Sequence, residues 1–191
     1  MFYHMITKQR DKWYAKNCPI TDIISYIENT NQMRDAQIDA IKTYLYLKIA
    51  CENKSLYELF TNGKFNSLNL DELPIPTAVR EKLNSDPALA ALYEYCYQPV
   101  DGKPSSESGI KAIQKTPEAV DANKFFKEAF YGVPYPDYLF SLPMGAGKTY
   151  LMAAFIYLDL YFAINEPTNT AFAHNFIIFA PSGLKSSVVP S

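Results

Sequence analysis

The chain is poor in the residues that build metal sites and disulfide frameworks. Of 191 residues, three are cysteine and two are histidine. Cys18, Cys51 and Cys96 lie far apart, and none belongs to a Cys-x-x-Cys pair. This spacing argues against a structural zinc site and predicts reduced, partly buried thiols. We therefore expect no metal site built from cysteine and histidine.

The chain also lacks a long apolar run and a strong charge of one sign. The longest apolar segment, residues 151–164, is interrupted by Asp159 and is too short to span a bilayer. The first twelve residues are mixed and charged, without the apolar core of a signal peptide. The net charge is −2, so no global basic field attracts nucleic acid, and any such contact must be local. We expect a cytoplasmic protein with no membrane association.

The residues that are present predict a globular, mainly helical chain. Hydrophobic residues make up 48% and charged residues 20%, which is typical of a protein with a packed core. The apolar spacing predicts helices at residues 21–28, 33–51, 77–83, 88–97 and 116–131. Asp86-Pro87 is a favourable helix start, because Asp can cap the helix and Pro suits its first position. Residues 98–108 are rich in Pro, Gly and Ser and predict a loop.

The most informative stretch is residues 140–149, Phe-Ser-Leu-Pro-Met-Gly-Ala-Gly-Lys-Thr. Gly145 and Gly147 lack Cβ atoms, so backbone N–H groups there can curl around phosphate oxygens. Lys148 supplies a positive charge for the β- and γ-phosphates, and the Thr149 hydroxyl can ligate Mg²⁺. The stretch therefore predicts a phosphate-binding loop, with Lys148 and Thr149 as its catalytic residues.

The context of this loop predicts an α/β fold. Residues 138–142 and 175–180 have the apolar character of buried parallel strands, and residues 150–164 form the helix between them. Together they would make one parallel βαβ unit, the start of an incomplete P-loop domain. Leu142 occupies the first glycine position of the full G-x-x-x-x-G-K-[ST] pattern. The alternative is a plain glycine turn beside an exposed lysine.

A second candidate motif opens the long helix upstream. Arg34 and Gln37 stand at its start, where they would ordinarily be solvated residues. A Gln amide, however, offers one acceptor and two donors, so it can match the adenine edge with both kinds of hydrogen bond. Beside a phosphate loop, this pair indicates a place for the base of a nucleotide.

The motifs resemble those of the first RecA-like domain of superfamily 2 helicases and translocases, and most of all the type III restriction enzyme Res subunit and UvrB-like DEAD/DEAH group. Arg34-x-x-Gln37 resembles the adenine-recognising Q-type motif, residues 142–149 resemble motif I, and residues 177–182 resemble motif Ia, whose following loop touches the nucleic-acid backbone. The resemblance implies ATP and Mg²⁺ as ligands, DNA as a partner, and a modification or specificity subunit as a further partner. The ATP-binding residues that it implies are Pro143, Met144, Gly145, Ala146, Gly147, Lys148, Thr149, Arg34 and Gln37, and the DNA-binding residues are Pro181, Ser182, Gly183 and Lys185.

The chain departs from that family in two respects. The span between Gln37 and Gly145 is unusually long, which predicts N-terminal helices at residues 1–49, a helical insertion at 50–137 and the truncated RecA-like domain at 138–191. The acidic motif Asp-Glu-x-His is absent. Asp159 follows Lys148 too closely for a parallel crossover, so we expect it on the polar side of the helix after the loop and not as the catalytic acid.

These observations predict the N-terminal part of an ATP-dependent DNA helicase or translocase, a hydrolase that is nearly inactive in this form. Hydrolysis needs a carboxylate to orient water and an arginine finger, and the sequence offers no candidate for either. Two alternatives stay open. One is a small P-loop phosphotransferase, and the other is a non-enzymatic helical interaction module with a degenerate nucleotide fold.

Overall fold

The computed structural model describes residues 1–16 and 18–179, and the chain divides into two compact units. Unit 1 is built from Met1–Asn17 and Lys54–Tyr138, and unit 2 from Cys18–Asn53 and Leu139–Ser191. Each unit is therefore made of two stretches that are distant in the sequence. In unit 2 this arrangement joins the two candidate motifs, because one lies in each stretch.

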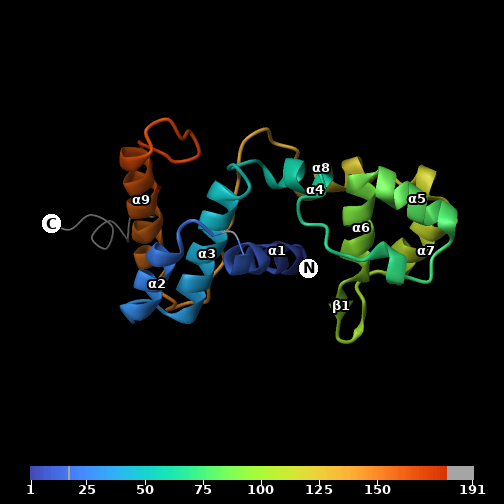
Figure 1. Ribbon diagram of the computed structural model, residues 1–191, viewed down its shortest axis with the longest axis horizontal. Coiled ribbons are helices and arrows are strands. Elements are labelled where there is room, and N and C mark those ends of the chain that lie inside the picture. Colours follow the sequence, from blue (N-terminus) through green and yellow to red (C-terminus); the bar gives the residue numbers. More distant parts are fainter. Residues whose placement is uncertain (17, 180–191) are drawn as a thin grey trace. The chain divides into compact units, whose positions relative to one another are not determined.

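Unit 1 consists of short helices and one hairpin (Figure 1). Asp86 caps one of these helices as expected, since its Oδ1 accepts a hydrogen bond from the Leu89 N–H at 3.0 Å. The elements of unit 1 are α1 (Phe2–Lys16), α4 (Leu56–Thr61), η1 (Leu70–Glu72), α5 (Thr77–Ser85), α6 (Pro87–Tyr97), β1 (Pro99–Val100), β2 (Lys103–Pro104), α7 (Glu107–Lys115), η2 (Pro117–Ala119) and α8 (Ala122–Ala129).

Aromatic rings fill the core of unit 1. Phe60 on α4 stacks on Phe126 of α8, with ring centroids 5.4 Å apart, and both side chains are fully buried. Phe2 of α1 meets the Phe60 ring edge-on at 5.1 Å. Large rings of this kind remove much apolar surface from water in a small volume, which is how a unit of such short helices gains its stability.

The hairpin β1–β2 occupies part of the segment that the sequence predicts as a loop. Val100 pairs with Lys103 in an antiparallel register, and Asp101 and Gly102 form the turn with φ values of 51° and 78°. Two consecutive residues with positive φ suit the right-handed twist of a two-residue hairpin, and Asp-Gly is a favoured sequence for it.

The described residues of unit 2, 18–53 and 139–179, form three helices. They are α2 (Thr21–Asn29), α3 (Asp35–Ile49) and α9 (Lys148–Asn165), and α3 packs against both of the others (Figure 1). Ile41 and Leu45 of α3 are fully buried and form the centre of this core. Among residues 1–16 and 18–179, no helix is both long enough and apolar enough to cross a membrane.

The predicted parallel βαβ unit, and with it the RecA-like α/β fold, is wrong for the part of the chain that the structure describes. The only sheet there is the antiparallel pair β1–β2, and neither residues 138–142 nor residues 175–179 form a strand. Leu139 and Phe179 are instead 92% and 93% exposed. An apolar run predicts a buried strand only if neighbouring strands complete its backbone hydrogen bonds, and two strands alone do not make a stable sheet.

Candidate nucleotide-binding loop

The loop before α9 has the curved backbone that an anion pocket needs. Gly145 and Gly147 adopt left-handed conformations with φ of 76° and 77°. Between them, the Ala146 N–H donates to the Pro143 carbonyl at 3.2 Å and closes a tight turn. Gly147 precedes α9, and its carbonyl accepts the first helical hydrogen bond, from the Leu151 N–H at 3.0 Å. The exposed loop therefore leads directly into the positive N-terminal end of an 18-residue helix.

The two polar residues of the loop stand at the start of this helix. Lys148 folds back over the loop, where its Nζ donates to the Pro143 carbonyl at 3.3 Å. Lys148 and Thr149 are both exposed, so a ligand can reach the ammonium and the hydroxyl. The ammonium, the helix end and the loop amides together provide positive potential for polyphosphate.

Gln37 of α3 is bound to the loop through its side chain. Its Nε2 donates to the Gly147 carbonyl at 3.0 Å, and its Oε1 accepts from the Arg34 N–H at 2.9 Å. The side chain is only 3% exposed. A Cβ added to Gly147 would lie 2.6 Å from Gln37 Nε2, so in addition to the strain of the positive φ it would displace this amide from its hydrogen bond.

Arg34 reaches the same loop one turn earlier. Its Nη1 donates to the Gly145 carbonyl at 2.6 Å, and the residue is exposed. A second cation therefore lies beside the loop, bound to the Gly145 carbonyl, whereas Lys148 is bound to the Pro143 carbonyl. The structure thus brings together two motifs that stand more than a hundred residues apart in the chain.

The described residues fit Mg²⁺ only as an ion that the nucleotide itself helps to hold. Thr149 offers one hydroxyl, and residues 1–16 and 18–179 contain no cluster of three His, Cys, Asp or Glu side chains that could form a metal cage. Mg²⁺ commonly keeps several waters and binds through one or two protein groups plus substrate phosphates. A single hydroxyl next to a phosphate loop is consistent with that mode.

The sequence predicts Asp159 on the polar side of its helix, and this prediction is wrong, because the residue is buried inside unit 2. The residue is 2% exposed; its Oδ1 accepts from the Tyr44 hydroxyl at 2.7 Å and its Oδ2 from Lys48 Nζ at 3.3 Å. Lys48 also donates to the Ala171 carbonyl at 2.7 Å, and the Ala173 N–H donates to Asp159 Oδ2 at 3.0 Å. The group ties α3, α9 and the segment after α9 together.

The pairing of Asp159 with Lys48 was not predicted from the sequence. Asp159 lies ten residues after Thr149 on α9, about 15 Å along the helix axis at the usual rise. Its two oxygens are occupied by Tyr44, Lys48 and backbone, so it serves the packing of the unit. The sequence does contain a signal for this pair, because Asp159 is the one acidic residue in the apolar run 151–164. A carboxylate buried by such a run needs a partner of opposite charge.

The remaining loop residues fall into two groups. Pro143 and Met144 are exposed, with Met144 at 98%, whereas Ala146 is buried beneath the turn. Pro181, Ser182, Gly183 and Lys185, the predicted DNA-binding residues, lie outside the described residues.

Comparison with known proteins identifies no relative of this chain. No model of a protein family, no curated protein and no solved structure matches it.

Proposed function

We propose that unit 2 binds ATP with Mg²⁺ at residues 143–149, and that the chain is part of an ATP-dependent DNA helicase or translocase. The observation that carries the first half of this proposal is the hydrogen bond from Gln37 to Gly147. Each of the two segments resembles one motif of a nucleotide-binding pair. In the folded chain they are in contact, through a hydrogen bond from a side chain of one to the backbone of the other.

Each residue of the loop has a chemical role in this proposal. The backbone amides around Gly145 and Gly147 surround the phosphate oxygens, and Lys148 exchanges its hydrogen bond with the Pro143 carbonyl for bonds to the β- and γ-phosphates. The Thr149 hydroxyl becomes one ligand of the metal ion held on the phosphates. Arg34 adds a second positive charge at the edge of the loop.

Hydrolysis of the nucleotide requires catalytic groups in addition to the residues of this binding site. A carboxylate must orient the attacking water, and a cation must neutralise the charge that develops in the transition state. Asp159 is engaged with Lys48 and stands far along the helix from the loop. We therefore propose that this chain binds nucleotide but turns it over slowly, and that the Asp-Glu-x-His motif it lacks must come from elsewhere.

Nucleotide-dependent thermal stabilisation tests the binding proposal. A ligand that binds only the folded state raises the melting temperature, and the stabilisation grows with the logarithm of the ratio of ligand concentration to dissociation constant. We expect Mg²⁺ with ATP or ADP to stabilise the chain, and Lys148→Ala to remove most of that shift. Lys111→Ala is the matched control, because Lys111 is an exposed lysine on a helix of unit 1.

The outcomes separate the candidate functions. If no nucleotide raises the melting temperature, the proposal is contradicted and the interaction module is favoured. Transfer of phosphate to a small acceptor would favour the phosphotransferase. DNA binding is measured by salt titration, since contacts to phosphates make affinity fall steeply with salt concentration. Binding without any salt slope would contradict the DNA half of the proposal.

A further inference from the structure

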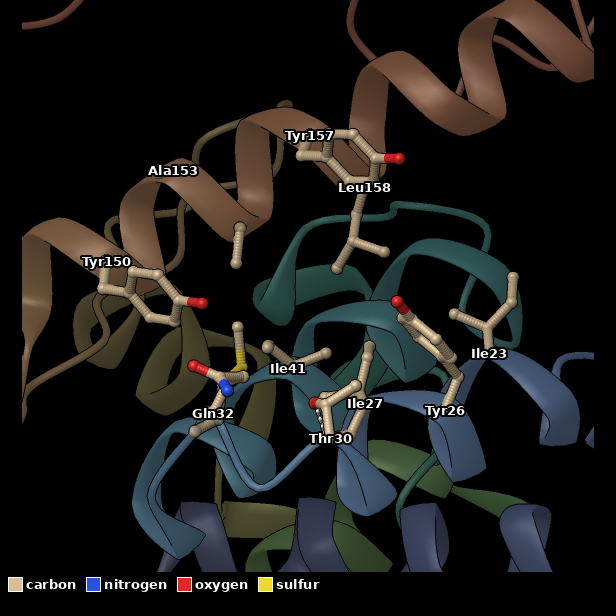
Figure 2. Close-up of a pocket in the computed structure, with 12 residues that line it drawn as sticks. Ile23, Tyr26, Ile27, Thr30, Gln32, Ile41, Tyr150, Ala153, Tyr157 and Leu158 are labelled. Carbon is tan, nitrogen blue, oxygen red and sulfur yellow. Dashed lines mark hydrogen bonds between the residues drawn. The ribbon is translucent and has the colours of Figure 1, made fainter.

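A groove of about 400 Å³ lies between α2 and α9 in unit 2, over Ile41 of α3 (Figure 2). Its lining is mainly apolar and includes three tyrosine rings, those of Tyr26, Tyr150 and Tyr157. The volume is within the range of about 300 to 1,000 Å³ that is usual for sites of small ligands. The groove is therefore large enough for a heterocyclic ring system.

One end of this groove borders the phosphate loop. Tyr150 lines it and directly follows Thr149, and Gln32 and Met33 line it and directly precede Arg34, whose side chain is bound to the Gly145 carbonyl. Figure 2 shows Tyr150 and Gln32 at the same end of the groove, with Ala153 of α9 pointing into it between Tyr150 and Tyr157. A ligand with its phosphates on the loop would thus find an aromatic surface and an amide beside it.

Gln37 is not free to recognise a base in this arrangement. Its amide nitrogen and oxygen are both engaged within the protein, and the side chain is almost fully buried. To reach a nucleotide it would have to break its hydrogen bond to Gly147 and so release the loop. Another side chain must supply the donor and acceptor that an adenine edge requires.

We propose that this end of the groove binds the adenine ring of the nucleotide, with Tyr150 as its stacking partner and Gln32 as the residue that reads its edge. The inference rests on the proposed function, because the phosphates of the same nucleotide are placed on residues 143–149. A Gln amide can accept from the adenine amino group and donate to N7, a pair of bonds that guanine cannot match. Gln37 is then a positioning residue that holds the loop.

Filling the groove tests this proposal. Binding of ATP and of inorganic tripolyphosphate, each with Mg²⁺, is measured by calorimetry for the wild-type chain and for Ala153→Phe. We expect the wild type to bind ATP at least about fivefold more tightly than tripolyphosphate, because stacking of a base on an aromatic side chain is worth about 1 to 3 kcal/mol. Ala153→Phe should lower ATP affinity to the tripolyphosphate level and leave tripolyphosphate affinity unchanged.

The control and the adverse outcomes are distinct. Ala112→Phe, at an exposed alanine on α7 of unit 1, should change neither affinity. If Ala153→Phe folds normally by circular dichroism and keeps the wild-type ratio of the two affinities, the groove does not bind the base, whereas phosphate binding at the loop still stands. If neither ligand binds the wild type, the proposed function fails together with this inference.

A second variant tests the role of Gln32. Gln32→Met keeps the length and most of the volume of the side chain but removes its donor and acceptor. We expect the variant to lose the preference of the wild type for ATP over GTP, while its affinity for tripolyphosphate is unchanged. An unaltered preference would assign recognition of the base to another residue and overturn the role proposed for Gln32.

Discussion

The side-chain amide of Gln37 donates a hydrogen bond to the carbonyl oxygen of Gly147 at 3.0 Å, across 110 residues of sequence. Its oxygen accepts from the Arg34 N–H, so one buried side chain connects the start of α3 to the start of α9. A buried amide with both ends engaged fixes its neighbours, because losing either bond leaves a polar group without a partner.

The first prediction concerns this amide. Gln37→Glu replaces the donor by a carboxylate oxygen that faces the Gly147 carbonyl, so we expect a loss of about 1 to 3 kcal/mol in the free energy of unfolding and weaker ATP binding. Urea titration and calorimetry measure the two effects. Gln114→Glu is the matched control, since Gln114 donates to the Tyr93 hydroxyl in unit 1 at 2.9 Å. The Tyr93 hydroxyl can turn its proton toward the new carboxylate, so the control should leave ATP affinity unchanged. Equal affinities in both variants would contradict the role of Gln37.

A second prediction separates the two glycines of the loop. Both have positive φ, which costs an L-residue about 1 to 2 kcal/mol, but only at Gly147 would a Cβ collide with Gln37. Gly147→Ala should therefore lower the free energy of unfolding by more than Gly145→Ala, where the added Cβ meets nothing within 4 Å. Urea titration compares them with Gly102→Ala, the equivalent change in the β1–β2 turn. Equal losses at Gly145 and Gly147 would show that the close contact with Gln37 has no energetic weight.

The third prediction concerns the buried ion pair. Asp159→Ala leaves the Lys48 ammonium buried without its carboxylate, so we expect a loss of about 3 to 5 kcal/mol in the free energy of unfolding. The double variant Lys48→Met with Asp159→Leu should recover much of that loss, because it removes both charges. Denaturant titration followed by circular dichroism measures each variant.

An exposed pair provides the control for this experiment. Lys111 Nζ lies 3.9 Å from Glu107 Oε2 on α7, and both side chains are largely exposed. Glu107→Ala should therefore lower the free energy of unfolding by less than about 1 kcal/mol. If Asp159→Ala were equally harmless, the carboxylate would not be the partner that keeps Lys48 buried.

A fourth prediction concerns thiol reactivity. Cys51 and Cys96 are 2% and 5% exposed, whereas Cys18 is partly exposed. Burial also raises the pKa of the Cys96 thiol, which lowers the fraction of reactive thiolate at neutral pH. Iodoacetamide should therefore modify Cys18 first in the native chain, and mass spectrometry of the labelled peptides identifies the site. Rapid native labelling of Cys18→Ser at either remaining cysteine would contradict the burial of that residue.

Several helices of this fold follow from the sequence because their signals are local. Asp86-Pro87 predicts the start of α6, and the apolar spacing from Ile38 to Ile49 predicts α3. The bounds of α1 are not evident from the sequence, because charged side chains interrupt the apolar pattern, although Met5 and Ile6 are buried. The loop predicted at residues 98–108 overlaps the start of α7, where the Ser106 hydroxyl accepts from the Gly109 N–H and caps the helix.

The candidate site could be predicted in part. The sequence predicts its residues as two motifs, because the spacing of Gly145, Gly147 and Lys148 is the one that phosphate binding requires. The contact of Gln37 with the loop and the pairing of Asp159 with Lys48 were not visible, since both join residues more than a hundred positions apart. The prediction of strands at residues 138–142 and 175–180 is wrong for a related reason, because an apolar run does not show whether neighbouring strands exist to pair with it.

The absence of strands at residues 175–179 has a consequence for handling the protein. Ile177, Ile178 and Phe179 stand in water as an uncharged β-prone run, with Ile177 83% exposed. Such a run is a nucleus for self-association, which grows with protein concentration while the fold stays intact. Aggregation of the protein in concentrated samples should therefore begin at this segment, and Ile177→Lys should slow that aggregation.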